Sequence, residues 1–285
     1  MPTLRWVGTT NDLATTTNWS PNGTPASNDT LRFVDANAIN IAGIDWTAKT
    51  GLIIEVGPQF AGSVGTAGTK WQTGTGTVVR YNGQRCTGFF LSPAGGTVYV
   101  SDTSSYPSAL TLYGTIGDVY CSRARSLNLM NGLTLTNLWL EGNQITAYLE
   151  SGLVLTNAYV QGGAITCEAA LTNLYQTGGI WDHCGSTTMN MTLAQIRGGT
   201  FNIRTTGGTY TAINVFGGRA DASQSHGITV TNGQVHYGAT LVLDNGENNI
   251  VATNAILVYG GTLIAGAGVS QTNYAASGTA GSSQM

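Results

Sequence analysis

Acidic side chains in the second half of the chain are the residues whose types could do chemistry. Between residues 126 and 262 they are Glu141, Glu150, Glu168, Asp182, Asp221, Asp244 and Glu247. Hydrolysis of a glycosidic bond needs two carboxyl groups that face one cleft, about 5 to 9.5 Å apart. Glu150 with Glu168, or Asp221 with Asp244, would form such a pair if its members came from adjacent coils of a repeat. Acids scattered over several coils make such pairs by chance, so no catalytic residue is predicted.

The histidines do not predict a catalytic relay or a metal site. They are His183, His226 and His236, and only His183 adjoins an acid, Asp182. Neighbouring residues of a strand point to opposite faces, so Asp182 and His183 cannot readily form a relay. We interpret the histidines as isolated surface or turn residues, and no metal ligand is predicted because companion ligands at zinc spacing are missing.

The cysteines are Cys86, Cys121, Cys167 and Cys184, without C-x-x-C spacing and too sparse for a disulfide scaffold. We expect them to be reduced residues of the core, where free cysteine is commonly found. Cys167 and Cys184 are one coil length apart and could stack near each other. Segment 62–70 superficially suggests a phosphate loop, but it lacks the G-K-[ST] ending. No cofactor is predicted.

The elements that position these residues form an internal repeat. Segments 135–142, 155–162 and 171–178 share the pattern L-T-N-x-aromatic-x-x-G, and looser copies follow at 194–199, 213–218 and 256–261. Glycines mark steps of 16 to 22 residues, at Gly142, Gly162, Gly178, Gly198, Gly217, Gly238 and Gly260. One step is the length of a solenoid coil, which buries its apolar side by stacking on its neighbours. The sequence therefore predicts an all-β fold, a β-solenoid of the right-handed parallel β-helix type.

Strand alternation predicts which side chains face outward. The positions four and two before the marker glycine are mostly apolar and should point inward, although Gln176 breaks this rule. The position between them holds Trp139, Tyr159 and Tyr175, which would align on the outer wall at about 4.8 Å spacing. This row could be a subunit contact, a platform for stacking glycans, or a wall packed under a loop. We favour the contact because aromatic residues are enriched at protein interfaces.

Asn137, Asn157 and Asn173 also fall in register. Stacked asparagines can hydrogen-bond side chain to side chain, as in the ladders of cross-β structures. This ladder is predicted to be structural.

The two ends differ from the repeat. Residues 1–57 hold an aromatic, proline-containing segment that we expect to be a capping or anchoring segment, because a solenoid needs a cover over its open core. The solenoid is predicted over 58–265, where short strand patterns at 78–81, 97–100, 109–113 and 127–129 precede the clear repeats. Residues 266–285 are rich in Gly, Ala and Ser and are expected to be a flexible tail.

Composition excludes several classes of function. Of 285 residues, 41% are hydrophobic and only 9% are charged, against roughly 25% charged in typical soluble domains. The net charge is -3 and the lysines are Lys49 and Lys70, so no basic face for nucleic acid is expected. The start of the chain lacks a signal-peptide pattern and no run of about 18 apolar residues is present, which predicts synthesis in a cytoplasm without membrane insertion.

Trp6-Val7-Gly8, Asn18-Trp19-Ser20-Pro21 and the later Asp29-Thr30-Leu31-Arg32-Phe33 resemble the lead-in of bacterial and phage β-helix proteins. With the depletion of lysine, the chain resembles tailed-phage appendage and capsid-decoration proteins. The resemblance implies a homotrimer on the virion surface that contacts capsid or tail proteins. The function predicted is that of a non-enzymatic structural protein. The alternative is a tailspike or receptor-binding protein that binds or cleaves host surface glycan.

Overall fold

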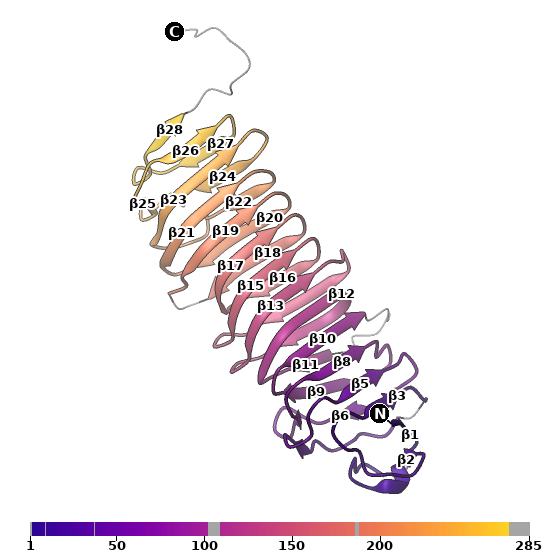
Figure 1. The fold of residues 1–285 in the computed structure, drawn as a ribbon. Helices are drawn as coiled ribbons and strands as arrows, with labels where there is room; N and C mark the ends of the chain where they lie inside the picture. The colour runs from indigo at the N-terminus through magenta and orange to yellow at the C-terminus, as the bar shows by residue number, and fades with distance from the viewer. Residues whose placement is uncertain (1, 9, 37, 102–108, 186–187, 274–285) are drawn as a thin grey trace, which may run out of the picture. The chain divides into compact units, whose positions relative to one another are not determined.

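The computed structural model describes residues 2–8, 10–36, 38–101, 109–185 and 188–273. The described residues are nearly all in strands and loops, and their only helix is the short 3-10 turn Thr16–Asn18. The chain divides into two compact units, Met1–Leu171 and Thr172–Met285. The strands of each unit stack in parallel, one coil on the next, which confirms the predicted β-solenoid (Figure 1).

The first unit has two rows of strands, which we name sheets A and B. Sheet A stacks β1 (Thr3–Trp6), β3 (Thr30–Phe33), β5 (Ile53–Val56), β8 (Thr77–Tyr81), β10 (Gly96–Ser101), β12 (Thr115–Leu129), β13 (Thr134–Leu140) and β15 (Val154–Val160). Sheet B contains β4 (Asp45–Trp46), β6 (Ser63–Val64), β7 (Trp71–Thr73), β9 (Gly88–Pro93), β11 (Ala109–Leu112), the second half of β12, β14 (Ile145–Leu149) and β16 (Ala164–Cys167). The strands predicted at 78–81, 97–100, 109–113 and 127–129 are therefore confirmed.

The second unit repeats this plan. Its sheet A contains most of β17 (Ala170–Gln176), then β19 (Met191–Ile196), β21 (Gly208–Val215), β23 (Ile228–His236), β25 (Val251–Ala252), β26 (Ile256–Tyr259) and β28 (Gln271–Asn273). Its sheet B contains β18 (Ile180–Gly185), β20 (Thr200–Thr205), β22 (Arg219–Asp221), β24 (Thr240–Leu243) and β27 (Thr262–Ala265).

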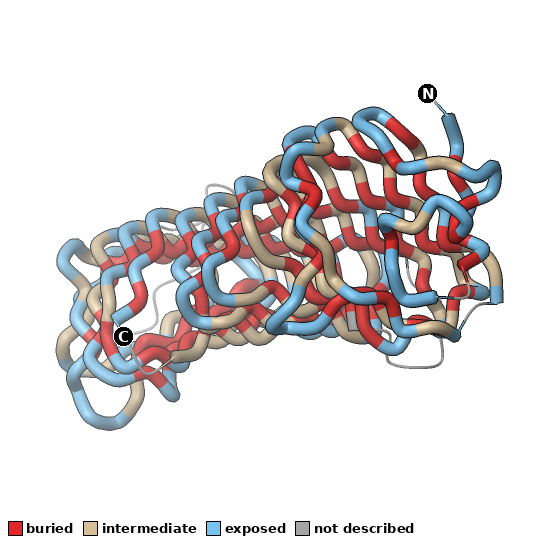
Figure 2. Tube along the Cα trace, turned by 90° about the horizontal axis from the view of Figure 1, so that it is seen from below, coloured by how far each residue is buried: buried red, intermediate tan, exposed pale blue. Residues whose placement is uncertain are grey.

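The core of each unit is built by the strand alternation that the repeat predicts. Leu138 and Leu140 of β13 are fully buried and pair in register with Ala158 and Val160 of β15, which are buried too. In both units the buried positions lie on the inner side of the coils (Figure 2). Removing these side chains from water contributes roughly 25 cal/mol per Å² of apolar surface, so each coil is stabilised mainly by the coils beside it.

The boundary predicted between the capping segment, residues 1–57, and the solenoid, residues 58–265, lies too late in the chain. Strands β1, β3 and β5 already stack in parallel and continue into β8, so coils begin well before residue 58. The end is closed by β2 (Trp19–Ser20), which pairs antiparallel to β1 and places Trp19 opposite Trp6. The two indoles meet edge to face at 5.1 Å between ring centroids, and Phe33 packs on both.

The boundary predicted between the solenoid and the tail, after residue 265, lies too early in the chain. Strand β28, which falls inside the predicted tail, pairs in parallel with β26. Residues 274–285 of that tail lie outside the described residues.

Close stacking makes glycine necessary at one corner of the coil. Gly96 has φ of +117°, and a Cβ added to it would lie 1.9 Å from the carbonyl oxygen of Thr77, its partner on β8. Gly132 also has positive φ, at +80°, but its Cβ would meet nothing within 4 Å. Substitutions at these two glycines can therefore be compared: both would strain the backbone, but only a substitution at Gly96 would also overlap the neighbouring coil.

We expect Gly132→Ala to lower the free energy of unfolding by about 1 kcal/mol, the cost of placing a Cβ at positive φ. Gly96→Ala should lower it by roughly 3 kcal/mol or more, because overlap with the neighbouring coil adds to the same conformational cost. Urea unfolding followed by circular dichroism measures both. Equal losses for the two variants would contradict the steric argument.

Candidate functional site

One outward-facing column of side chains runs through sheet A of the first unit. Each member lies directly opposite the next on the adjacent strand, and we name this set the outward column. Its members are, in order, Arg5, Arg32, Glu55, Arg80, Tyr99, Tyr120, Trp139 and Tyr159. The column therefore changes from charged to aromatic residues between β8 and β10.

The aromatic half of the outward column is a stack of nearly parallel rings. Ring centroids are 5.3 Å apart between Tyr99 and Tyr120, 5.7 Å between Tyr120 and Trp139, and 3.8 Å between Trp139 and Tyr159. The interplanar angles are 12°, 10° and 9°. Inside the stack the ring faces cover one another and the ring edges point outward. A sugar ring stacks on an aromatic face, so the interior of this row offers edges where a glycan platform needs faces.

Of the three aromatic residues predicted from the repeat, Trp139 and Tyr159 lie in the first unit and stack directly on each other. Tyr175 lies in the second unit, opposite Gln195 of β19. Tyr99 and Tyr120 were missed. The signal was present, because Val98-Tyr99-Val100 has the same apolar–aromatic–apolar spacing as Leu138-Trp139-Leu140, but no marker glycine follows it.

The charged half of the outward column is a network of ion pairs. Glu55 lies between two arginines, 3.0 Å from Arg32 and 3.3 Å from Arg80. Arg5 pairs with Asp35. The arginine side chains are about half exposed, so each pair is worth at most about 1 kcal/mol. The arginines therefore remain open to other anions.

A cavity of about 450 Å³ lies where the two halves of the outward column meet. Its lining includes the side chains of Arg32, Glu55, Arg80 and Tyr99 from the column. Further lining residues come from the ends of the same strands and the segments that follow them, and they are Val34, Val56, Gly57, Pro58, Tyr81, Asn82 and Ser101. The cavity is open to solvent, and all of it belongs to the first unit.

Asn137 and Asn157, two of the predicted ladder residues, are directly hydrogen-bonded. The Asn157 Nδ2 donates to Asn137 Oδ1 at 2.9 Å, and Asn137 Nδ2 donates to Asp118 Oδ1 at 2.8 Å. Asp118 ends this chain of bonds because an ionised carboxylate only accepts. Asn173 lies in the second unit, opposite Leu193. A similar bond there, from Asn254 Nδ2 to Asn232 Oδ1 at 2.8 Å, was not foreseen.

The members of each candidate acid pair follow or lie in strands of adjacent coils, and three of the four acids accept hydrogen bonds from neighbouring groups. Glu150 and Glu168 follow the register pair Leu149 and Cys167, and Glu150 Oε2 accepts the backbone N–H of Asn131 at 2.7 Å. Asp221 accepts two hydrogen bonds from Arg219, at 2.6 and 2.9 Å.

The environment of Asp221 favours its charged form. Partial burial alone would raise its pKa, but hydrogen bonds from Ser223 and the charge and hydrogen bonds of Arg219 outweigh burial and lower the pKa. A general acid for glycoside cleavage needs a raised pKa instead. Asp221 is therefore suited to stabilising its turn.

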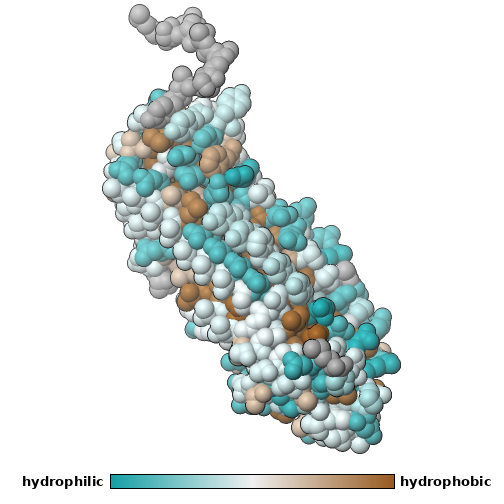
Figure 3. Space-filling view, viewed as in Figure 1, coloured by the Kyte–Doolittle hydropathy of each residue, from teal (hydrophilic) through white to brown (hydrophobic). Residues whose placement is uncertain are grey.

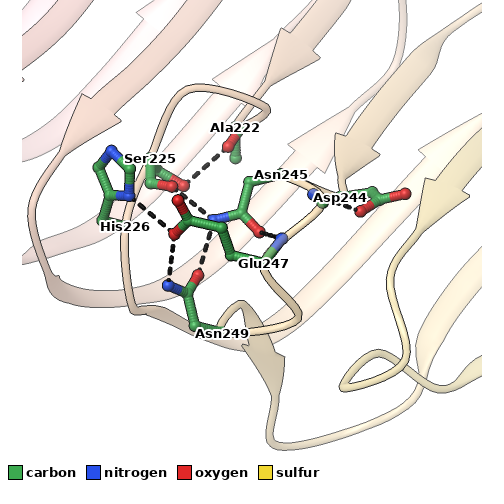
Figure 4. Close-up of polar contacts among 8 residues, drawn as sticks. Ala222, Ser225, His226, Asp244, Asn245, Glu247 and Asn249 are labelled. Carbon is green, nitrogen blue, oxygen red and sulfur yellow. Dashed lines mark hydrogen bonds and ion pairs between the residues drawn. The ribbon is translucent and has the colours of Figure 1, made fainter.

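Asp244, the other member of that pair, begins a polar loop that continues through Glu247 (Figure 4). Its Oδ1 accepts the N–H of Gly246 at 2.9 Å. Glu247 accepts from His226 at 2.9 Å, and the hydrogen bonds of His226 and then of Asn249 lower the pKa of this exposed carboxyl. The loop is held by its own side chains, an arrangement that stabilises a turn.

The interpretation of all the histidines as surface or turn residues is wrong for His183. It lies in β18, is fully buried, and its Nδ1 is 2.9 Å from the hydroxyl of Tyr210. His236 lies between two rings, with centroids 4.5 Å from Phe216 and 4.8 Å from Tyr259. This second, shorter column was not predicted, because Phe216 and Tyr259 directly precede the marker glycines Gly217 and Gly260, whereas the aromatic position of the repeat is three residues before the glycine.

Cys86, Cys121 and Cys167 are buried, as expected. Cys184 is only half-buried, so its assignment to the core was wrong. Strand parity explains the difference, since His183 takes the inward position of β18 and Cys184 therefore faces outward. Cys167 faces inward, so Cys167 and Cys184 do not share a face.

The class of protein that this fold and site define is a parallel β-solenoid with an outward column of stacked side chains. The chain matches no known family model, no curated protein and no solved structure. Across the described ranges, three or more His, Cys, Asp or Glu side chains nowhere gather as a metal site would require. In the same part of the chain no helix has the length and apolar character needed to cross a bilayer.

Replacing Trp139 tests the stack. Trp139→Ala should lower the free energy of unfolding by roughly 2 to 3 kcal/mol, because the ring contacts with Tyr120 and Tyr159 and part of the buried area are lost. Trp139→Phe keeps a ring in the row and should retain most of the stability and of the aromatic signal in near-UV circular dichroism. If alanine and phenylalanine behave alike, the rings do not stabilise one another.

Asp221→Asn tests the local role of this acid. The pKa of Asp221 is lower in the folded state, so its contribution is present above the unfolded value of about 3.9 and is lost as pH falls through the folded value. We expect the variant to melt at lower temperature than the wild type near pH 7, with a deficit of about 1 kcal/mol. The difference should vanish in strong acid. Arg219→Gln should reproduce part of the deficit, and a difference that persists in strong acid would contradict the assignment.

Proposed function

We propose that the protein is a structural component of a bacteriophage virion, a capsid decoration or head-fibre-like appendage, that acts through its shape and through symmetric contacts with copies of itself. Capsid or tail proteins are its further partners in this proposal. The single observation that carries the contact is the direct stacking of Trp139 on Tyr159, with ring centroids 3.8 Å apart, at the end of the outward column away from Tyr99.

The stack is suited to self-association because it is rigid before binding. Each ring is held by its neighbours, so little side-chain entropy remains to be lost when a partner covers the outward edges. Aromatic residues are enriched at the centres of protein interfaces. The mutually covered faces inside the stack make a contact between subunits a better use of this row than a row of sugar subsites.

The low charge of the surface supports a role in permanent assembly. The face seen in Figure 3 is mostly pale, the colour of residues of intermediate hydropathy, with teal and brown patches between. The centres of protein interfaces are depleted of charged residues. Only 9% of the residues of this chain are charged, so few charged side chains stand in the way of such an interface. The surface can therefore be covered over a large area without desolvating many ions.

The lead-in motif supports the proposal only through the fold. Trp6 and Trp19 form the buried cluster at the closed end, and the Trp19 indole N–H donates to the Leu13 carbonyl at 2.9 Å. The Asn18 side chain donates to Thr10 and to the backbone of Asp12. The residues that carry the resemblance thus start a solenoid, and the assignment to a virion rests on the resemblance itself.

Sedimentation of the purified chain tests the contact. We expect a homotrimer for the wild type and a smaller species for the double variant Trp139→Ala and Tyr159→Ala. The variant Tyr237→Ala is the matched control, because this tyrosine is 82% exposed and belongs to the second unit, so its trimer should persist. Circular dichroism establishes that each variant is folded. A monomeric wild type, or a folded double variant that remains trimeric, overturns the proposal.

A further inference from the structure

We infer that the first unit carries a binding site for an acidic saccharide, in the cavity where Tyr99 meets Arg32, Glu55 and Arg80. This inference goes beyond the proposed structural function and uses the opposite end of the outward column from Trp139 and Tyr159. A virion protein can possess the site or lack it without any change in how copies assemble.

The aromatic wall of the cavity is the exposed end of the ring stack. Tyr120 covers one face of Tyr99, and the other face is directed toward β8, where the column continues with Arg80. Tyr99 is 45% exposed, whereas the other rings of the stack are only partly exposed. The stack thus holds the Tyr99 ring in place from one side, and the ring lines the cavity beside Arg80, where the apolar face of a sugar ring can pack against it.

The charged wall of the cavity selects for an anion. Arg32 and Arg80 both pair with the single carboxylate of Glu55, so the three side chains carry a net positive charge. A guanidinium can bind a carboxylate with two parallel hydrogen bonds, and each arginine uses only part of its donors on Glu55. A second carboxylate, carried by the ligand, would complete this network.

Glu55 favours a ligand that carries hydroxyl groups as well as an anionic group. It stands between the arginines as a hydrogen-bond acceptor, and a phosphate dianion has no O–H to donate to it. The same carboxylate accepts hydrogen bonds from hydroxyl groups, and Ser101 adds a hydroxyl to the lining. A uronic acid offers a carboxylate to the arginine pair, hydroxyl groups to Glu55 and an apolar ring face to Tyr99.

The remaining walls and the size agree with a saccharide. Val34, Val56 and Pro58 supply apolar surface beside the polar groups, as in small-molecule sites generally. A volume of about 450 Å³ suits a sugar unit or two, and the open side allows a longer chain to pass. The site lies on one compact unit, so its geometry depends only on the stacking of β3, β5, β8 and β10.

Titration calorimetry with a galacturonate tetrasaccharide tests the site, with a galactose tetrasaccharide as the uncharged comparison. We expect binding of the galacturonate that weakens with added salt, and at least about tenfold weaker binding for each of Arg80→Gln and Tyr99→Leu. The galactose tetrasaccharide should bind at least about tenfold more weakly than the galacturonate, because it lacks the carboxylates. Both substitutions lie on the wall of the unit, so circular dichroism is expected to report a folded protein.

Two control variants separate the site from general effects of charge and aromatic surface. Arg204→Gln and Tyr237→Ala remove an exposed arginine and an exposed tyrosine of the second unit, and both should bind galacturonate as the wild type does. The inference is overturned if galacturonate does not bind, if Arg80→Gln and Tyr99→Leu bind as tightly as the controls, or if inorganic phosphate or adenosine monophosphate binds more tightly than galacturonate. Because the readout is ligand affinity, failure here leaves the trimer measurement untouched.

Discussion

Parallel, in-register stacking of one coil on the next, at about 4.8 Å, is the constraint on which the rest of this structure depends. It places the same position of successive coils in one line, so any residue type that recurs becomes a column. Recurring apolar residues form the core, recurring asparagines form side-chain hydrogen bonds, and recurring aromatic residues form a stack of rings. The same closeness forbids a Cβ at Gly96, where the carbonyl of the neighbouring coil lies in the way.

The outward column in the first unit gives one wall of the solenoid two chemical characters. From Arg5 to Arg80 its side chains are charged and partly exposed, and from Tyr99 to Tyr159 they are aromatic and cover one another. Stacking covers the ring faces inside the row, and Tyr99 at the junction is the most exposed of the four rings. An aromatic residue inside such a column is therefore suited to contact through its edge, whereas the ring at the end is suited to contact through its face.

The acidic residues follow a different rule, because they lie mostly in turns. Asp221 and Asp244 accept hydrogen bonds from groups within two residues of themselves, and Glu247 closes a loop with His226 and Asn249. These local bonds stabilise the reversals of the chain between strands. For Asp221 and Glu247 the hydrogen bonds lower the pKa and favour the charged form, opposite to what an acid catalyst requires.

The sequence by itself determined the solenoid, the coil length and the inward and outward positions of the clear repeats, because apolar alternation and the recurring L-T-N pattern are local signals. It also placed Trp139 next to Tyr159 and Asn137 next to Asn157. Only the tertiary structure decided that Tyr99 and Tyr120 continue the aromatic row, that arginines extend the same line, and that the coils begin at β1. Coil lengths vary before residue 135, so the register of the strands there depends on how turns of unequal length pack. Neither the composition nor the periodicity of the sequence specifies how these turns pack. The inward position of His183 has the same cause, since the parity of β18 is set by the strands beside it.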